Sequence, residues 1–226
     1  EVRPQMAGRP TGVLHGLQSN FHVFVRHPTF ATELAHLPLA EMVARMRDPA
    51  IKQRILSEHS SITRTLSAAS LADLLWQIFP LGEAPNYEPN REDSVAGIAQ
   101  RRGQDAFEVM YDLLIGNGGK ELFYQPLGGY QNYNFDFFRT NMQHPNIMFG
   151  LSDGGAHCGV IADAGMPTFI LTHWGRDRTK GERLPLEYLV RKLSFDTAAA
   201  YGMHDRGLLA PGQLADVNVI DFDNLT

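Results

Sequence analysis

The sequence predicts an α/β domain with a parallel sheet, because apolar runs typical of strands alternate with stretches of helical periodicity. KELFYQPL (120–127) and NIMFGLSD (146–153) have the composition of strands, and NFDFFRTNMQ (134–143) between them has helical spacing. Such alternation is typical of a sheet covered by helices. In these folds ligand-binding side chains lie at the carboxyl ends of strands, which is where Asp153 lies after NIMFGL.

The first half of the chain carries further element signals. Residues 10–25 predict a strand, a loop and a short apolar segment, and residues 38–59 have helical spacing that Pro49 interrupts. Residues 83–93 form a polar loop with two prolines. Residues 94–116 predict one helix, with Asp93 or Ser94 as its cap and Gly116 to Gly119 at its end.

The second half continues the pattern. MPTFILTHW (166–174) and LPLEYLVRKLSFDTAAAYG (184–202) predict helices. RGLLAPGQLADVNVID (206–221) predicts a Gly/Pro turn that leads into a strand. We expect two parts, residues 1–206 as the main α/β domain and residues 207–226 as the start of another.

Composition excludes several classes of protein. The chain has 226 residues, of which 43% are hydrophobic and 20% charged, and this is ordinary for a globular protein. Its net charge of -5 gives no electrostatic case for nucleic acid. No stretch approaches the ~18 apolar residues of a membrane span, and the first residues lack the apolar core of a signal peptide. With one cysteine, Cys158, no internal disulfide forms, so we expect a cytoplasmic protein.

Residues 151–159, LSDGGAHCG, place an acid, a base and a thiol on one turn. Asp153 is either a cap or turn-forming residue, or a carboxylate that acts as a general base or metal ligand. Gly154 and Gly155 allow a sharp turn close to a ligand. His157 is either a surface histidine or a site residue tuned by Asp153, and Cys158 is a small buried hydrophobe or a metal ligand.

Local catalytic motifs are otherwise missing from the sequence. There is no His-x-His, His-Glu-x-x-His, Cys-x-x-Cys or Gly-x-Ser-x-Gly, and GNGGKE (116–121) is a helix stop rather than a phosphate loop. His15, His22 and His27 are close in sequence but match no metal motif, so we expect surface or core histidines. His173 is expected to pack beside Trp174 rather than bind a ligand.

Four segments together resemble the later part of N-acyl-D-amino-acid deacylases, which are members of the metal-dependent amidohydrolase superfamily. The segments are RPTGVLHGLQ (9–18), GLSDGGAH (150–157), PTFILTHWGRDR (167–178) and residues 182–221. The resemblance implies the C-terminal portion of a (β/α)8 TIM barrel, about strands seven and eight, followed by the start of a small β-sandwich. It also implies hydrolysis of a small-molecule amide and one or two zinc ions in the complete enzyme.

By motif position, the resemblance makes Asp153 the catalytic carboxylate at the end of strand eight and a tentative metal ligand. His157, Gly154 and Gly155 then line the substrate pocket or support it. The family's other metal ligands, a His-x-His, a bridging Cys or modified Lys and two single histidines, have no counterpart here. Well-studied D-aminoacylases carry an Arg shortly after the Asp, whereas CGVIADAGMP (158–167) has Asp163 and no Arg.

The sequence begins on Glu1 and stops just after a strand-like run, so we expect a piece of a longer polypeptide that is inactive alone. An open barrel exposes strand edges, and we therefore expect self-association or pairing with the remaining part. Two alternatives stay open. One is a non-catalytic binding or scaffold domain that kept the fold. The other is a self-contained hydrolase that uses Asp153, His157 and Cys158.

Overall fold

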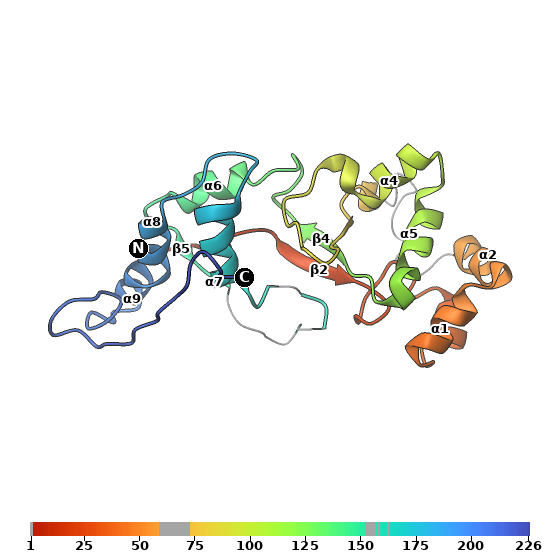
Figure 1. The fold of residues 1–226 in the computed structure, drawn as a ribbon, viewed down its shortest axis with the longest axis horizontal. Coiled ribbons are helices and arrows are strands. Elements are labelled where there is room, and N and C mark those ends of the chain that lie inside the picture. The colour runs from red at the N-terminus through yellow and green to blue at the C-terminus, as the bar shows by residue number, and fades with distance from the viewer. Residues whose placement is uncertain (1, 59–72, 152–156, 158, 162) are drawn as a thin grey trace. The chain divides into compact units, whose positions relative to one another are not determined.

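A computed structural model describes residues 2–58, 73–151, 157, 159–161 and 163–226. The chain divides into two compact units (Figure 1). Unit 1 consists of Glu1–Thr11, Asn134–Ala156 and Asp163–Thr226, and unit 2 of Gly12–Tyr133 and His157–Ala162. Both units contain helices and strands, which agrees with the expected α/β class.

Unit 1 contains a short parallel strand pair with helices around it. Strand β1 (Gln5–Met6) pairs with β5 (Met148–Phe149), with Gln5 opposite Met148 and Met6 opposite Phe149. The strand predicted at 146–153 therefore forms, although it is shorter than expected. The helices are α6 (Asp136–Met142), α7 (Met166–Phe169), which continues into a π-helix (Ile170–Asp177), α8 (Leu186–Leu193) and α9 (Phe195–Ala200).

Trp174 is the largest fully buried side chain of unit 1. Its Nε1 donates to the backbone oxygen of Gly8 at 2.7 Å, which attaches the N-terminal segment to the π-helix. A Cβ atom at Gly8 would collide with the side chain of Ile170, so only glycine permits this close approach. The N-terminal segment thus packs on residues more than 150 positions later.

Arg9 and Asp163 form a buried ion pair next to this contact. Nη1 of Arg9 donates to Oδ1 of Asp163 at 2.8 Å, and each side chain is only 2% exposed. The guanidinium of Arg9 also lies 5.0 Å from the centre of the Phe169 ring. A buried charge is stable only with an opposite charge and hydrogen bonds, so each residue depends on the other.

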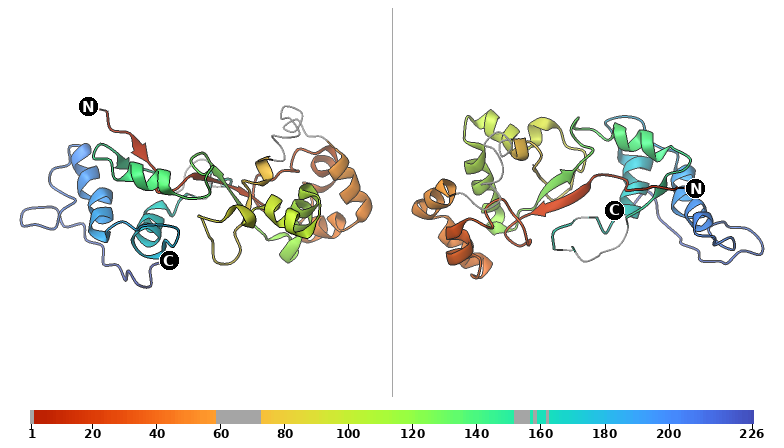
Figure 2. Two further views of the ribbon diagram at one scale, coloured as in Figure 1. Left: turned by 90° about the horizontal axis from the view of Figure 1, so that it is seen from above. Right: turned by 180° about the vertical axis from the view of Figure 1, so that it is seen from behind.

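Unit 2 contains a three-stranded sheet in the order β2-β4-β3. Its strands are β2 (Thr11–His15), β3 (Phe79–Pro80) and β4 (Phe123–Leu127), and β3 is antiparallel to β4. Figure 2 shows β2 and β4 side by side. The helices are a π-helix (Phe30–Leu34), α1 (Leu39–Met46), α2 (Pro49–Ser57), α4 (Val95–Arg102) and α5 (Ala106–Leu114), with 3-10 turns at Arg91–Asp93 and Gly116–Gly119.

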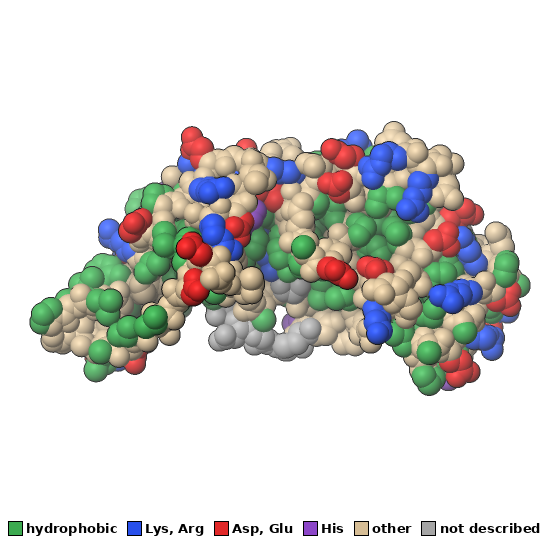
Figure 3. Space-filling view, viewed as in Figure 1, with side chains coloured by type: hydrophobic (Ala, Val, Ile, Leu, Met, Phe, Trp, Pro, Cys, Tyr) green, Lys and Arg blue, Asp and Glu red, His purple; other side chains and the backbone are tan. Residues whose placement is uncertain are grey.

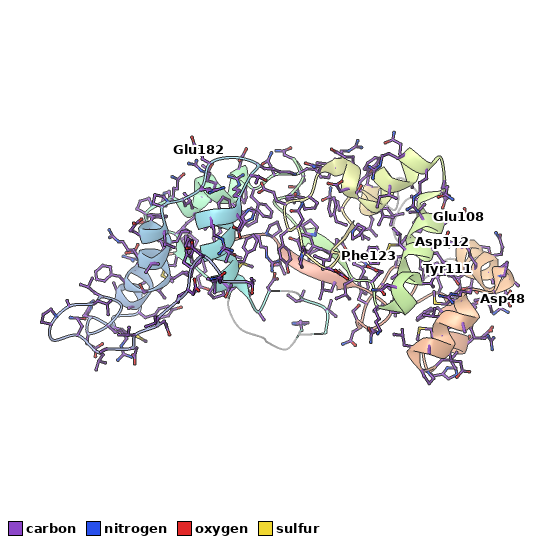
Figure 4. All side chains as sticks on the ribbon, viewed as in Figure 1. Asp48, Glu108, Tyr111, Asp112, Phe123 and Glu182 are labelled. Atoms are coloured by element: carbon purple, nitrogen blue, oxygen red, sulfur yellow. The ribbon has the colours of Figure 1, made fainter. Side chains whose placement is uncertain are left out.

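Helix α5 supplies much of the core of unit 2. Four of its residues are buried, and the Tyr111 hydroxyl donates to the backbone oxygen of Met46 at 2.9 Å. Figure 4 labels Tyr111 and Asp112 on α5, and Asp112 accepts a hydrogen bond from Nζ of Lys52 on α2 at 2.7 Å. Helices α1, α2 and α5 are therefore joined by one apolar core and by polar contacts at its edge.

Several helix boundaries follow from local chemistry. Asp48 caps α2 by accepting from the Ala50 nitrogen, and Pro49 is the first residue of α2, so the predicted break at Pro49 is confirmed.

The single helix predicted over 94–116 is wrong, because Gly103 adopts a left-handed conformation (φ 63°) and ends α4. Asp105 then caps α5, and Ser94, one of the two predicted caps, caps α4. The single helix predicted over 184–202 likewise divides into α8 and α9 at Ser194.

The strand predicted near residues 215–221 does not form in the structure. Val219 is 97% exposed, and other apolar side chains of this C-terminal segment are exposed as well, as the green atoms of Figure 3 show. A strand needs a neighbour to accept its backbone hydrogen bonds, and no described strand lies beside this segment.

In the described part of the chain, no helix has the length and apolar character that crossing a bilayer requires.

The substitution Asp163→Asn tests the buried pair. It removes the carboxylate charge from a pair whose side chains are each 2% exposed, and we expect the free energy of unfolding to fall by more than about 1 kcal/mol, measured by urea denaturation. Asp205→Asn, which removes the exposed partner of Arg206, is the matched control and should cause no measurable change. Equal stability of the two variants would contradict the role of the pair.

Candidate functional site

The predicted site residues fall in two groups with respect to the structure. Asp153, Gly154, Gly155 and Cys158 lie outside the described residues. His157 and the residues that lead into and out of the turn are described. Of the predicted acid, base and thiol, the structure therefore describes only the base, His157, and the residues on either side of the turn.

The strand that leads to Asp153 is anchored to the N-terminal segment by backbone hydrogen bonds. The Met148 nitrogen donates to the Pro4 oxygen at 3.0 Å, and the Gly150 nitrogen donates to the Met6 oxygen at 2.9 Å. Both residues of β5 are buried. Leu151 follows in a left-handed conformation with φ 66°, which costs a non-glycine residue free energy and is common at functional sites.

The residues that follow the turn are attached to β2. The His157 oxygen accepts from the nitrogens of Val160 and Ile161, and the Leu14 nitrogen donates to the Val160 oxygen at 2.6 Å. The side chain of His157 is exposed and makes no hydrogen bond or ion pair with another described residue. Its backbone is thus fixed by unit 2, while its imidazole stays accessible to solvent.

Asp163 has a structural partner, which bears on substrate recognition. It lies in the segment where the resemblance implies an arginine that holds the substrate carboxylate, and instead it binds Arg9 in a buried pair. Because this carboxylate neutralises Arg9, the position supplies no free positive charge. The structure gives Asp163 a packing role that the sequence pattern did not indicate.

The three N-terminal histidines are core residues. His15, His22 and His27 are 0%, 2% and 4% exposed. Nε2 of His15 lies 2.8 Å from Oε1 of Gln125, Nδ1 of His22 accepts from the Phe24 nitrogen, and Nδ1 of His27 lies 2.8 Å from the Ile55 oxygen. The prediction of surface or core histidines is confirmed as core for these three.

The described residues do not form the metal site that the resemblance implies. Within the ranges the structure covers, no three side chains among His, Cys, Asp and Glu converge in a way that would hold a metal ion.

Burial keeps two of these histidines neutral. Desolvation lowers the pKa of His15 to about 4, although its hydrogen bond to Gln125 acts in the opposite direction. Desolvation, aided by repulsion from His15 and His27, lowers the pKa of His22 to about 3. Both imidazoles are therefore neutral donors and acceptors at neutral pH rather than cations.

His173 packs as expected. Its ring stacks on Phe169 at 4.7 Å between ring centres and meets Phe135 and Trp174 edge to face. Nearby, Arg178 stacks over Trp174 and donates to Oδ1 of Asp136 at 2.8 Å. Trp174 and Arg178 of the motif THWGRDR are therefore buried in unit 1 and in contact with each other.

The comparison with family models decides the family. The model of the amidohydrolase family matches residues 10–226. The chain belongs to the amidohydrolase family. The match supports a hydrolase of the amidohydrolase type, and members of this family generally use metal ions. The comparisons with curated proteins and with solved structures found no match.

The buried histidines predict a pH-dependent stability. Unfolded histidine has a pKa near 6.5, whereas the folded pKa values of His15 and His22 are about 4 and about 3. Between these values and pH 6.5 the unfolded chain binds more protons, so stability is complete above about pH 6.5 and falls as the pH is lowered. We expect a loss of about 2–4 kcal/mol between pH 7 and pH 5 in urea denaturation.

Replacement of these histidines gives the control. His22→Gln should flatten the dependence, whereas His36→Gln, at an exposed histidine of the same unit, should leave it unchanged. Exposed aspartates with a lowered pKa, such as Asp205, take up protons only below about pH 4, so they do not change the stability between pH 7 and pH 5. A stability that is flat from pH 7 to pH 5 would show that these imidazoles are not buried neutral.

Proposed function

We propose that this chain is part of an enzyme that hydrolyses the C–N bond of an amide, with an N-acyl-D-amino acid or a related small amide as substrate. The single observation that carries the proposal is the family match over residues 10–226. The support from geometry is that β5 is a buried, paired strand whose exit leads within four residues of Phe149 to Asp153. The motif SDGGAH supports the deacylase branch of the family.

Asp153 is the proposed catalytic carboxylate. A carboxylate at a strand end is held rigidly enough to accept a proton from the attacking water and to deliver it to the leaving amine. The water oxygen then forms the new C–O bond, the C–N bond breaks, and the products are a carboxylic acid and an amine. His157 is the proposed neighbour that lines the pocket together with Gly154 and Gly155.

We further propose the C-terminal portion of a (β/α)8 barrel for residues 1–206 and the start of a β-sandwich for residues 207–226. The support is the superfamily resemblance of residues 206–221 and the parallel pairing of β1 with β5. When bound in the complete enzyme, zinc would polarise the amide carbonyl and lower the pKa of water. A cytoplasmic location and a lack of activity in the isolated chain are part of the same proposal.

A second candidate is a non-catalytic domain that kept the fold. One observation favours it: among the described residues, no three side chains of His, Cys, Asp or Glu lie together as metal ligands would. The preceding coding sequence distinguishes the two: a His-x-His after an early strand supports the enzyme, and its absence supports the binding domain.

Asp153→Asn tests the catalytic assignment in the full-length protein. With N-acetyl-D-amino acids as substrates and their L-enantiomers as controls, we expect kcat to fall by about 10²–10⁴-fold with little change in KM, since the amide cannot accept a proton. Asp216→Asn, at an exposed aspartate of the C-terminal segment, should leave both constants unchanged. Full activity of Asp153→Asn would exclude Asp153 as the proton carrier.

Metal content tests how much of the site this chain holds. Residues 1–226, purified alone, should bind far less than one zinc per chain by inductively coupled plasma mass spectrometry, because the described residues supply no ligand set. About one zinc per chain, lost in Cys158→Ala, would instead support the self-contained hydrolase. His157 and Cys158 would then be ligands rather than neighbours of the site.

A further inference from the structure

Unit 2 contains a cavity that the amide-hydrolysis proposal does not use. Its volume is about 420 Å³, and its lining comes from β4, from the loop that follows β4, from residues just before β3 and from Arg91. Cavities of this size hold small organic ligands. None of the predicted site residues, Asp153 to His157, lines it.

One wall of the cavity is aromatic and rigid. Tyr130 and Tyr133 meet edge to face at 6.0 Å between ring centres, and both pack in the same way on Phe79. The Tyr130 hydroxyl donates to the Pro89 oxygen at 2.6 Å, and Nε2 of Gln77 donates to the Tyr133 hydroxyl at 3.2 Å. These bonds fix both rings, and the buried Tyr130 supports the partly exposed Tyr133, whose ring is available to a ligand.

The turn that carries Tyr133 supports this interpretation. Tyr133 has φ 54°, a left-handed conformation that is unfavourable for a large side chain. Such strain persists where the surrounding structure holds it, and it is concentrated at binding sites. The loop therefore keeps Tyr133 against the cavity at a conformational cost.

Arg91 brings a positive charge to the cavity. Its guanidinium carbon lies 3.7 Å from the centre of the Trp76 ring, so the group is held flat on the indole. No described carboxylate lies within ion-pair distance of Arg91, although Asp73 also lines the cavity. The planar N–H groups of Arg91 are therefore available to a carboxylate, which they match in geometry.

Gln125 adds a second, oriented donor. Its Oε1 accepts the hydrogen bond from Nε2 of His15, a residue with no exposed surface that is neutral at pH 7. Gln125 lines the cavity, and its amide nitrogen, which bonds to no other described residue, is a donor on this side chain. His15 acts here as a positioning residue, and its Nδ1, which has no described hydrogen-bond partner, fits a tautomer protonated at Nε2.

We propose that this cavity binds a small carboxylate that carries an aromatic or other flat group. The carboxylate accepts hydrogen bonds from Arg91 and from the Gln125 amide, and the flat group packs against the partly exposed Trp76 and Tyr133. The Asp73 carboxylate at the same cavity disfavours a second negative charge on the ligand. Binding requires no turnover, so the proposal stands or falls separately from amide hydrolysis.

Calorimetric titration of the chain with phenylacetate tests the proposal. We expect saturable binding at one site per chain, at least tenfold weaker in Arg91→Gln and in Gln125→Ala, with the neutral isostere phenylacetamide also at least tenfold weaker. Arg102→Gln is the matched control, because Arg102 is exposed on α4 and does not line the cavity. The fluorescence change on binding should disappear in Trp76→Phe.

Three outcomes would overturn the proposal. The first is no saturable binding of phenylacetate to a chain whose far-UV circular dichroism shows a folded state. The second is equal binding of phenylacetate and phenylacetamide, or equal binding by the wild type and Arg91→Gln. The third is binding of inorganic phosphate as tight as that of phenylacetate, which would show a general anion site without an aromatic subsite.

His15→Gln should weaken phenylacetate binding but not phenylacetamide binding. Equal loss for both ligands would contradict the positioning role of His15.

Discussion

The buried ion pair between Arg9 and Asp163 is the constraint on which unit 1 depends. The two residues are 154 positions apart in sequence and each is 2% exposed, so their ion pair joins two distant segments inside the core of the unit. The pair holds the N-terminal segment against the residues that follow the candidate turn, and the Trp174 bond to Gly8 and the β1–β5 pairing act in the same direction. The strand that leads to Asp153 is positioned by the same segment, because Met6 of β1 accepts from the nitrogen of Gly150.

Unit 2 is held together by an apolar core that contains three buried imidazoles, of which those of His15 and His22 are neutral. His15, His22 and His27 replace water with hydrogen bonds to Gln125, Phe24 and Ile55, which allows polar rings to be buried among aromatic side chains. The cost is a stability that falls in mild acid, because protonation favours the unfolded chain. For His15 the same burial has a use, since a neutral ring that donates from Nε2 holds the oxygen of the Gln125 amide.

Sequence patterns predicted the local elements better than the long-range contacts. The strands around Phe123 and Met148, the break at Pro49 and the packing of His173 follow from residue type and spacing. The helix predicted over 94–116 was wrong because its apolar periodicity continues past Gly103, where the backbone turns left-handed and Asp105 begins a new helix. The ion pair of Arg9 with Asp163 and the placing of Arg91 and Gln125 on one cavity have no local signal, because only the fold brings these residues together. The amidohydrolase family could be inferred from motifs. The role of the turn at Asp153 stays a prediction, because Asp153 lies outside the described residues.

Family membership fixes the type of chemistry more firmly than the substrate. An N-acyl amino acid carries a carboxylate, and its recognition requires a positive charge near the catalytic carboxylate. In the segment where the resemblance implies such an arginine, this chain has Asp163, and the cation nearest to that aspartate, Arg9, is already neutralised by it. Arg9 is buried and paired with Asp163, so it is not exposed to a substrate in this structure. If the proposed N-acyl amino acid is the substrate, its carboxylate is therefore bound by residues other than Arg9 and Asp163.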